Sequence, residues 1–181
     1  MPKNSRLLLA ACLLTGCSHN TATESPAAIA TLKDASGRDV GSAEFRTANK
    51  GLAVRIRVSG FSAGSHGVHI HAVGTCDAAT TVVFSSAGGH FNPTSKQHGR
   101  LNPAGYHAGD LPNIVVDASG NGTLDATAES LALTDGVAAI LDADGSAVVV
   151  HANQDDKRTD AGPSGPGNSG ARVACGVIRR G

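Results

Sequence analysis

Leu52-Ala-Val-Arg-Ile-Arg-Val58 alternates apolar and polar side chains with a period of two residues. That period places every second side chain on the same face of an extended chain, so the segment predicts a half-buried β-strand. Turn-forming sequences rich in Gly, Asn, Asp and Ser separate it from several other strand-like segments. The other segments cover residues 28–32, 41–46, 68–72, 114–117, 122–127, 147–151 and 172–178. Eight short strands with regular turns predict an all-β sandwich or barrel.

The composition limits the class of protein. The 181 residues carry 15 Lys plus Arg and 15 Asp plus Glu, which argues against a strongly basic surface for nucleic acid. Hydrophobic residues make up 40% and aromatic residues only 3%, so we expect a core of Val, Ile, Leu and Ala. Residues 126–133 are the one place where a helical turn or two fits the pattern. Residues 74–113 and 152–170 show little strand pattern, and loops of such length are often functional.

An export signal is predicted at the N-terminus. Lys3 and Arg6 precede an apolar run of residues 7–14, which is far shorter than the roughly 20 residues that span a bilayer. The run ends in Leu14-Thr-Gly-Cys17, which resembles the lipobox of bacterial lipoproteins. We therefore expect a lipoprotein signal peptide over residues 1–16 and a lipid on Cys17. The alternative is an ordinary signal cut nearby, with Cys17 lost or free.

The predicted processing defines the mature chain. Residues 17–27 would form a polar tether and residues 28–181 the folded domain. Ser18 is not the acidic residue associated with retention in the inner membrane, so we expect a periplasmic lipoprotein anchored to the outer membrane. Loss of residues 1–16 leaves 13 basic and 15 acidic residues, a net charge of −2.

Cys76 and Cys175 remain once Cys12 leaves with the signal and Cys17 takes the lipid. An even number of cysteines in an exported protein predicts a disulfide, because the compartment is oxidising. The alternative is two buried free thiols. The disulfide would close a loop of about 100 residues and contribute a few kcal/mol in the chain-entropy account.

Most of the eight histidines are candidate metal ligands. His69 and His71 share one face of the predicted strand 68–72, because side chains two apart point the same way. His151 ends the strand 147–151 and can join this pair. The loop 74–113 adds three imidazoles and a carboxylate, which suit a tetrahedral zinc site; they are His90, His98, His107 and Asp110.

The donor count suggests how two sites are related. Six His and one Asp give seven ligands, whereas two four-coordinate sites need eight. One imidazole bound through both nitrogens would close the gap, and so would an open three-ligand site. Imidazole-rich sites suit copper as well as zinc. His19 and His66 do not belong to either group of candidate ligands. We expect His66 to be solvated or hydrogen-bonded at the head of its strand.

Five ordered motifs resemble the copper/zinc superoxide dismutase family over residues 29–178. The resemblance implies an eight-stranded Greek-key flattened barrel with two long functional loops, copper and zinc as cofactors, and the superoxide anion as substrate. The motifs are Gly67-Val-His-Ile-His-Ala-Val-Gly74, Gly89-His-Phe-Asn-Pro93, His98-Gly99, His107-Ala-Gly-Asp-Leu-Pro-Asn113 and Gly167-Asn-Ser-Gly-Ala-Arg-Val-Ala-Cys-Gly-Val-Ile178.

The resemblance also implies roles for individual residues. Arg172 stands at the family's active-site arginine, and Cys76 and Cys175 at its intrasubunit disulfide. Asp155, with Asp156 as its neighbour, stands at the carboxylate that links a copper ligand to a zinc ligand. The implied copper ligands are His69, His71, His90 and His151. The implied zinc ligands are His90, His98, His107 and Asp110, so that His90 bridges the two metals and takes part in catalysis.

The implied function is dismutation of superoxide to dioxygen and hydrogen peroxide, protecting the cell envelope. The alternative is a periplasmic copper/zinc-binding protein on the same fold with little turnover. The complete ligand set and the presence of Arg172 favour the enzyme. The sequence leaves open whether the protein is a homodimer or a monomer.

Overall fold

All eight predicted strands are present in the computed structural model, which describes residues 25–159 and 166–181. Two further short strands, β4 and β10, complete the sheet. The strands are β1 (Ala28–Asp34), β2 (Asp39–Thr47), β3 (Leu52–Val58), β4 (Gly64–His66), β5 (Val68–His71), β6 (Ile114–Val116), β7 (Gly122–Ala128), β8 (Ala147–His151), β9 (Arg172–Val177) and β10 (Arg179–Arg180). The all-β class is confirmed. The predicted signal peptide and Cys17 lie outside the described residues.

The helical turn expected over residues 126–133 is wrong. β7 continues to Ala128, which pairs with Leu52 of β3, and turns follow it. Leu124 and Ala128 are both buried. A spacing of four residues puts two side chains on one face of a strand as well as on one face of a helix, which explains the ambiguity.

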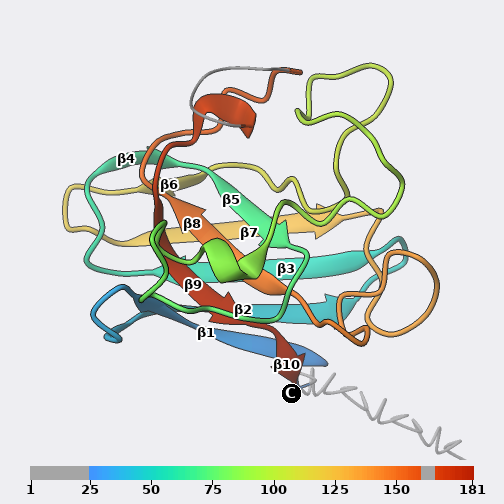
Figure 1. Cartoon of the computed structure of the whole chain (residues 1–181), viewed down its shortest axis with the longest axis horizontal. Coiled ribbons are helices and arrows are strands. Elements are labelled where there is room, and N and C mark those ends of the chain that lie inside the picture. The colour runs from blue at the N-terminus through green and yellow to red at the C-terminus, as the bar shows by residue number, and fades with distance from the viewer. Residues whose placement is uncertain (1–24, 160–165) are drawn as a thin grey trace, which may run out of the picture.

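The sheet wraps almost completely around the core (Figure 1). Its strand order is β4-β6-β7-β3-β2-β1-β9-β8-β5, with β10 paired to β1. The chain crosses over the barrel between β3 and β4 and again between β7 and β8, as in Greek-key folds. β4 and β5 stand at opposite ends of this order, yet only Gly67 separates them in the chain. The chain at Gly67 thus brings the two ends of the sheet together, and the Gly67 carbonyl extends the pairing of β5 with β8 by accepting a hydrogen bond of 2.9 Å from the backbone N–H of His151.

Side-chain alternation fills the barrel with aliphatic residues. In β3 the apolar positions 52, 54, 56 and 58 are buried, and the positions between them are exposed. β8 is buried on both faces: Val148 and Val150 enter the main core, and Ala147 and Val149 enter a smaller cluster with Phe84. β8 therefore gives the site a strand that is packed on both sides.

Two long connections, residues 74–113 and the described parts of 152–170, lie outside the named strands. Residues 74–113 contain only one short 3₁₀ helix, η1 (Ser85–Ala87), and no named strand. The second connection, residues 152–170, includes η2 (Pro166–Asn168). The predicted disulfide is confirmed: Cys76 is bonded to Cys175 of β9, with 5.7 Å between their Cα atoms. Within the described part of the chain, no helix is long and apolar enough to cross a membrane.

Candidate metal centre

Strand register brings the first group of histidines together. β5 and β8 are antiparallel, with His69 opposite Val149 and Val68 opposite Val150, so His151 follows at the adjacent strand end. His90 enters from the long loop through an isolated bridge to His71. The donor atoms of the four imidazoles lie within 4.8 Å of one another. We call this group the strand cluster: His69, His71, His90 and His151.

Three nitrogens of the strand cluster are buried without a hydrogen-bond partner, namely His69 Nδ1, His71 Nε2 and His151 Nε2. The opposite nitrogens are engaged. His71 Nδ1 donates to the Gly88 carbonyl at 2.9 Å, and His151 Nδ1 donates to the Gly170 carbonyl at 3.1 Å. In neutral imidazole, the nitrogen without hydrogen carries a lone pair. Buried lone pairs without partners are costly, so this arrangement suits a metal ion.

The electrostatics of the strand cluster favour neutral imidazoles. Burial, together with the neighbouring His90, lowers the pKa of His69 to about 3. Burial also lowers the pKa of His151 to about 4, and it lowers the pKa values of His71 and His90. At neutral pH the four lone pairs are therefore available without loss of a proton.

The second group forms within the loop around one carboxylate. Asp110 Oδ1 lies 2.9 Å from Nδ1 of His90 and 3.3 Å from Nδ1 of His107. Asp110 Oδ2 lies 3.0 Å from Nδ1 of His98. Three imidazoles and one carboxylate are a common tetrahedral zinc set. We call this group the loop cluster: His90, His98, His107 and Asp110, whose donors also lie within 4.8 Å of one another.

The loop cluster has the opposite electrostatic character. Burial opposes the charge on His98, but hydrogen bonds to Asp110 and Asp155 outweigh it and raise the pKa of His98 to about 10. Burial also opposes the charge on Asp110, yet its three histidine partners hold the pKa of its carboxyl well below the usual range. The backbone N–H of Gly99 donates to Asp110 Oδ2 at 3.0 Å. The loop cluster is thus held by charge-assisted contacts.

His90 belongs to both clusters. Its ring centroid lies 3.8 Å from that of His69, 5.0 Å from that of His71 and 5.4 Å from that of His107. Its Nδ1 faces the loop cluster, which leaves Nε2 for the strand cluster. The structure therefore has the arrangement that the donor count suggested, one ring between two sites.

Asp155 connects the two clusters from outside. Its Oδ2 lies 2.7 Å from His69 Nε2, and its Oδ1 lies 3.1 Å from His98 Nε2. Asp156 instead accepts a hydrogen bond from Asn168, so Asp155 and not its neighbour makes the link. A carboxylate in this position fixes the tautomer and orientation of both rings.

Sequence reasoning did not identify the groups that hold Asp155. Asn113 bonds the backbone of Asp155 twice, at 2.9 Å each. Asn113 closes the fourth motif, but nothing in the sequence assigns its partner. The predicted hydrogen-bonded role of His66 is confirmed: its ring nitrogens lie 2.8 Å from the His151 carbonyl and 2.9 Å from the Ser62 carbonyl.

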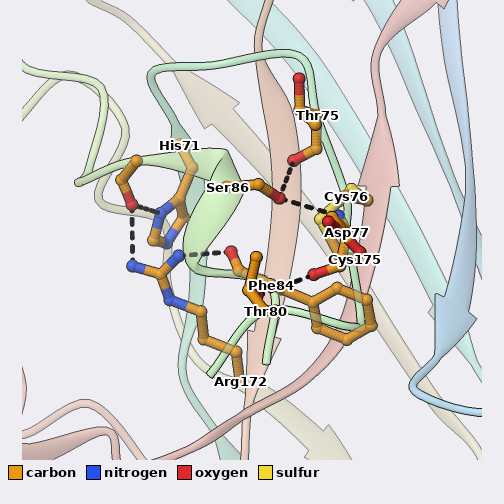
Figure 2. Close-up of a disulfide and its surroundings, with 10 residues drawn as sticks. His71, Thr75, Cys76, Asp77, Thr80, Phe84, Ser86, Arg172 and Cys175 are labelled. Carbon is orange, nitrogen blue, oxygen red and sulfur yellow. Dashed lines mark hydrogen bonds between the residues drawn. A yellow bond between two sulfur atoms is a disulfide. The ribbon is translucent and has the colours of Figure 1, made fainter. Parts of the chain in front are cut away.

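Arg172 lies beside the strand cluster (Figure 2). Its guanidinium donates to the carbonyls of Phe84 at 2.6 Å and Gly88 at 2.7 Å. The Gly88 carbonyl also accepts from His71 Nδ1, so one backbone oxygen joins Arg172 to a strand-cluster imidazole. The disulfide from Cys76 to Cys175 ties this loop to β9, the strand that begins with Arg172.

Known proteins are similar to this chain in sequence and fold. The sequence matches the family described as copper/zinc superoxide dismutase (SODC) over residues 40–178. Superoxide dismutase (Cu-Zn) 2 of Aquifex aeolicus is 37% identical over 181 residues, covering 99% of this chain and 100% of that protein. Superoxide dismutase (Cu-Zn) of Caulobacter vibrioides is 40% identical over 155 residues, covering 84% of this chain and 85% of that protein. The crystal structure of a SOD-like protein from Bacillus subtilis has a TM-score of 0.73 and 40% identity, covering 82% of this chain and 96% of that chain. This chain belongs to the copper/zinc superoxide dismutase family.

Proposed function

We propose that this chain is an exported copper/zinc superoxide dismutase in which the strand cluster holds copper and the loop cluster holds zinc. Family membership makes it an enzyme that converts superoxide to dioxygen and hydrogen peroxide. The observation that carries the ligand assignment is the membership of His90 in both clusters. The unpartnered buried nitrogens of the strand cluster support it.

The metals divide the chemistry. Bound copper supplies the one-electron change that dismutation requires, whereas zinc has no redox chemistry and contributes charge and geometry. His90 Nδ1 is fixed beside Asp110 at 2.9 Å, so Nε2 is the nitrogen available on the copper side. We assign to this atom one of the two protons that hydrogen peroxide needs, held when Nε2 is not bound to copper; solvent would supply the other. Asp155 keeps the His69 and His98 rings oriented throughout.

Arg172 would attract and orient the anionic substrate. Its half-buried guanidinium lies next to the strand cluster, and two carbonyls hold it in place. A fixed positive charge at the mouth of a site raises the local concentration of an anion, and the effect weakens with salt. The steering needs only this local field and operates at a mature net charge of −2.

Metal content and activity test the enzyme assignment against the binding-protein alternative. We expect the purified mature chain to hold about one copper and one zinc and to show cyanide-sensitive dismutase activity. Stoichiometric copper with no activity would establish a copper/zinc-binding protein with little turnover. Copper retained by a chain with His69→Ala and His71→Ala would reject the strand cluster as the copper site.

We also propose that the protein is exported to the periplasm and anchored by a lipid on Cys17. The lipobox at Cys17 and the apolar run before it support export, lipidation and a periplasmic location on the outer membrane, where the enzyme would protect the envelope. Incorporation of labelled fatty acid into the chain, and its loss in Cys17→Ser, tests the anchor. A Cys17→Ser chain that still incorporates the label would reject it. Light scattering would decide between homodimer and monomer, both of which fit the fold.

A further inference from the structure

A groove of about 640 Å³ lies on the barrel surface away from both metal clusters. β1, the end of β9, β10 and the disulfide loop form its walls. No residue of the strand cluster or the loop cluster lines it. The groove therefore contains no proposed metal ligand, although it includes Phe84, whose carbonyl accepts a hydrogen bond from Arg172.

The rim of the groove is cationic. Lys33, Arg179 and Arg180 line it; Lys33 is paired with Asp39, whereas both arginines are exposed. Among residues 25–159 and 166–181, no carboxylate forms an ion pair with Arg179 or Arg180. The one carboxylate in the lining, Asp34, is paired with the guanidinium of Arg38. Two guanidinium groups are thus available to an external anion.

The floor of the groove is largely apolar. Ile29, Ala78 and Val177 are among its lining residues, and 42% of the surface of Ile29 is exposed. An apolar floor beneath unpaired arginines matches the boundary of a phospholipid layer, where phosphates lie next to acyl carbons. Guanidinium groups also bind phosphate oxygens in a bidentate manner.

The groove lies where the predicted tether joins the barrel. β10 pairs with the first residues of β1, with Arg180 opposite Ala28 and Arg179 opposite Ile29 (Figure 1). Cys17 precedes Ala28 by 11 residues, which can span at most about 40 Å when extended. A lipid on Cys17 would thus keep the two arginines within about 40 Å of the membrane surface, close enough for the chain to bring them into contact with it.

We propose that Arg179, Arg180 and the adjoining groove dock the enzyme onto anionic phospholipid headgroups. The proposal rests on the proposed lipid anchor, to which it adds an orientation. The groove between β1, β10 and residues 76–84 faces the membrane. Anionic lipids attract basic residues close to the surface, and the attraction reinforces a lipid anchor.

Vesicle binding of the metal-loaded mature chain with Cys17→Ser tests the docking without any acyl chain. We expect it to bind vesicles of phosphatidylglycerol mixed into phosphatidylcholine, to bind phosphatidylcholine alone much less, and to lose binding as salt is raised. Arg179→Ser with Arg180→Ser should weaken anionic binding by about 30-fold, since each basic residue contributes about fivefold. The matched control, Lys96→Ser with Arg158→Ser, removes two exposed charges from the metal-site loops and should leave binding unchanged.

Three outcomes would overturn the docking surface. Equal anionic binding by the Arg179/Arg180 variant and its parent would do so, and so would an equal loss in the Lys96/Arg158 control. Light scattering of the same variants detects the competing occupant: if the arginine substitutions alter self-association and not vesicle binding, the groove is an interface between two copies. Failure of the anchor would appear separately, as absence of labelled fatty acid on Cys17 while the Cys17→Ser chain still binds anionic vesicles.

Discussion

The strand cluster and the loop cluster share His90 but are organised by different forces. In the strand cluster, the pairing of β5 with β8 fixes the histidines, and burial keeps their imidazoles neutral. In the loop cluster, the carboxylate of Asp110 gathers three imidazoles, and the contacts raise the pKa of His98 to about 10. Backbone register prepares the first site, and charge pairing prepares the second. The two sites should therefore respond differently to substitution and to pH.

The largest effect is expected from removing the ring common to both clusters. His90→Ala should weaken copper and zinc together and abolish activity, a loss greater than the roughly 10- to 100-fold typical of outer partners. His98→Ala, the matched substitution in the loop cluster alone, should mainly release zinc. Metal analysis by mass spectrometry after dialysis measures both. Equal copper loss in the two variants would contradict the bridging position of His90.

Substitution of Asp155, which links the two clusters, should have the next largest effect. Asp155→Asn leaves an amide that cannot accept hydrogen bonds from both His69 and His98, so we expect metal affinity to fall by about 10- to 100-fold. Competition with a chelator measures the affinity. Asp156→Asn changes the neighbouring carboxylate, which bonds Asn168, and should leave metal affinity unchanged. Similar losses in both variants would remove the special role of Asp155.

Substitution of Arg172 should affect attraction of the substrate and leave metal binding unchanged. Arg172→Ala should retain copper and zinc but lower the rate by about tenfold and flatten its dependence on salt, since a fixed charge near the strand cluster is lost. Arg172→Lys keeps the charge and should recover most of the salt dependence. Pulse radiolysis at several ionic strengths gives the rates. An unchanged rate in Arg172→Ala would exclude Arg172 from the mechanism.

The smallest expected effect is in proton release: binding of zinc should release about one proton more than binding of copper. His98 has a raised pKa of about 10, so it is protonated in the metal-free fold at pH 7 and zinc must displace that proton. Its protonation stabilises the metal-free fold fully below the unfolded value of 6.5, and this stability is lost as the pH rises through about 10. Zinc affinity should therefore increase with pH over this range.

Copper binding to the strand cluster of the zinc-free chain should release no proton at pH 7, because the pKa values of His69 and His151 are about 3 and 4 and His90 then binds through one nitrogen. Titration calorimetry in buffers of different ionisation enthalpy measures proton release for each metal. If zinc and copper release the same number of protons, the electrostatic contrast between the clusters is wrong.

Local patterns determined much of this protein. Alternation with a period of two predicted β3, because a strand with one buried face must alternate, and strand-like segments, several separated by turn sequences, predicted the other seven. The His69-x-His71 spacing identified a chelating pair, since residues two apart share a face. Residue type alone also indicated the donors, because imidazole and carboxylate are metal ligands wherever they meet. β4 and β10 escaped prediction because Gly64–His66 and Arg179–Arg180 contain no apolar side chain, unlike the similarly short β6.

Long-range packing decided the rest. The sequence could not show that Gly88 joins Arg172 to His71, or that Asn113 holds Asp155, because these partners are separated by 17 to 84 residues and meet only when the loops fold onto the barrel. Gly167 is another case. Its φ of +69° and the closeness of the Asp155 carboxylate and the His98 ring leave no room for a Cβ there. Residue type thus determined which chemistry this chain can perform, whereas the tertiary structure decided which atoms meet, because contact between distant segments depends on the whole path of the chain.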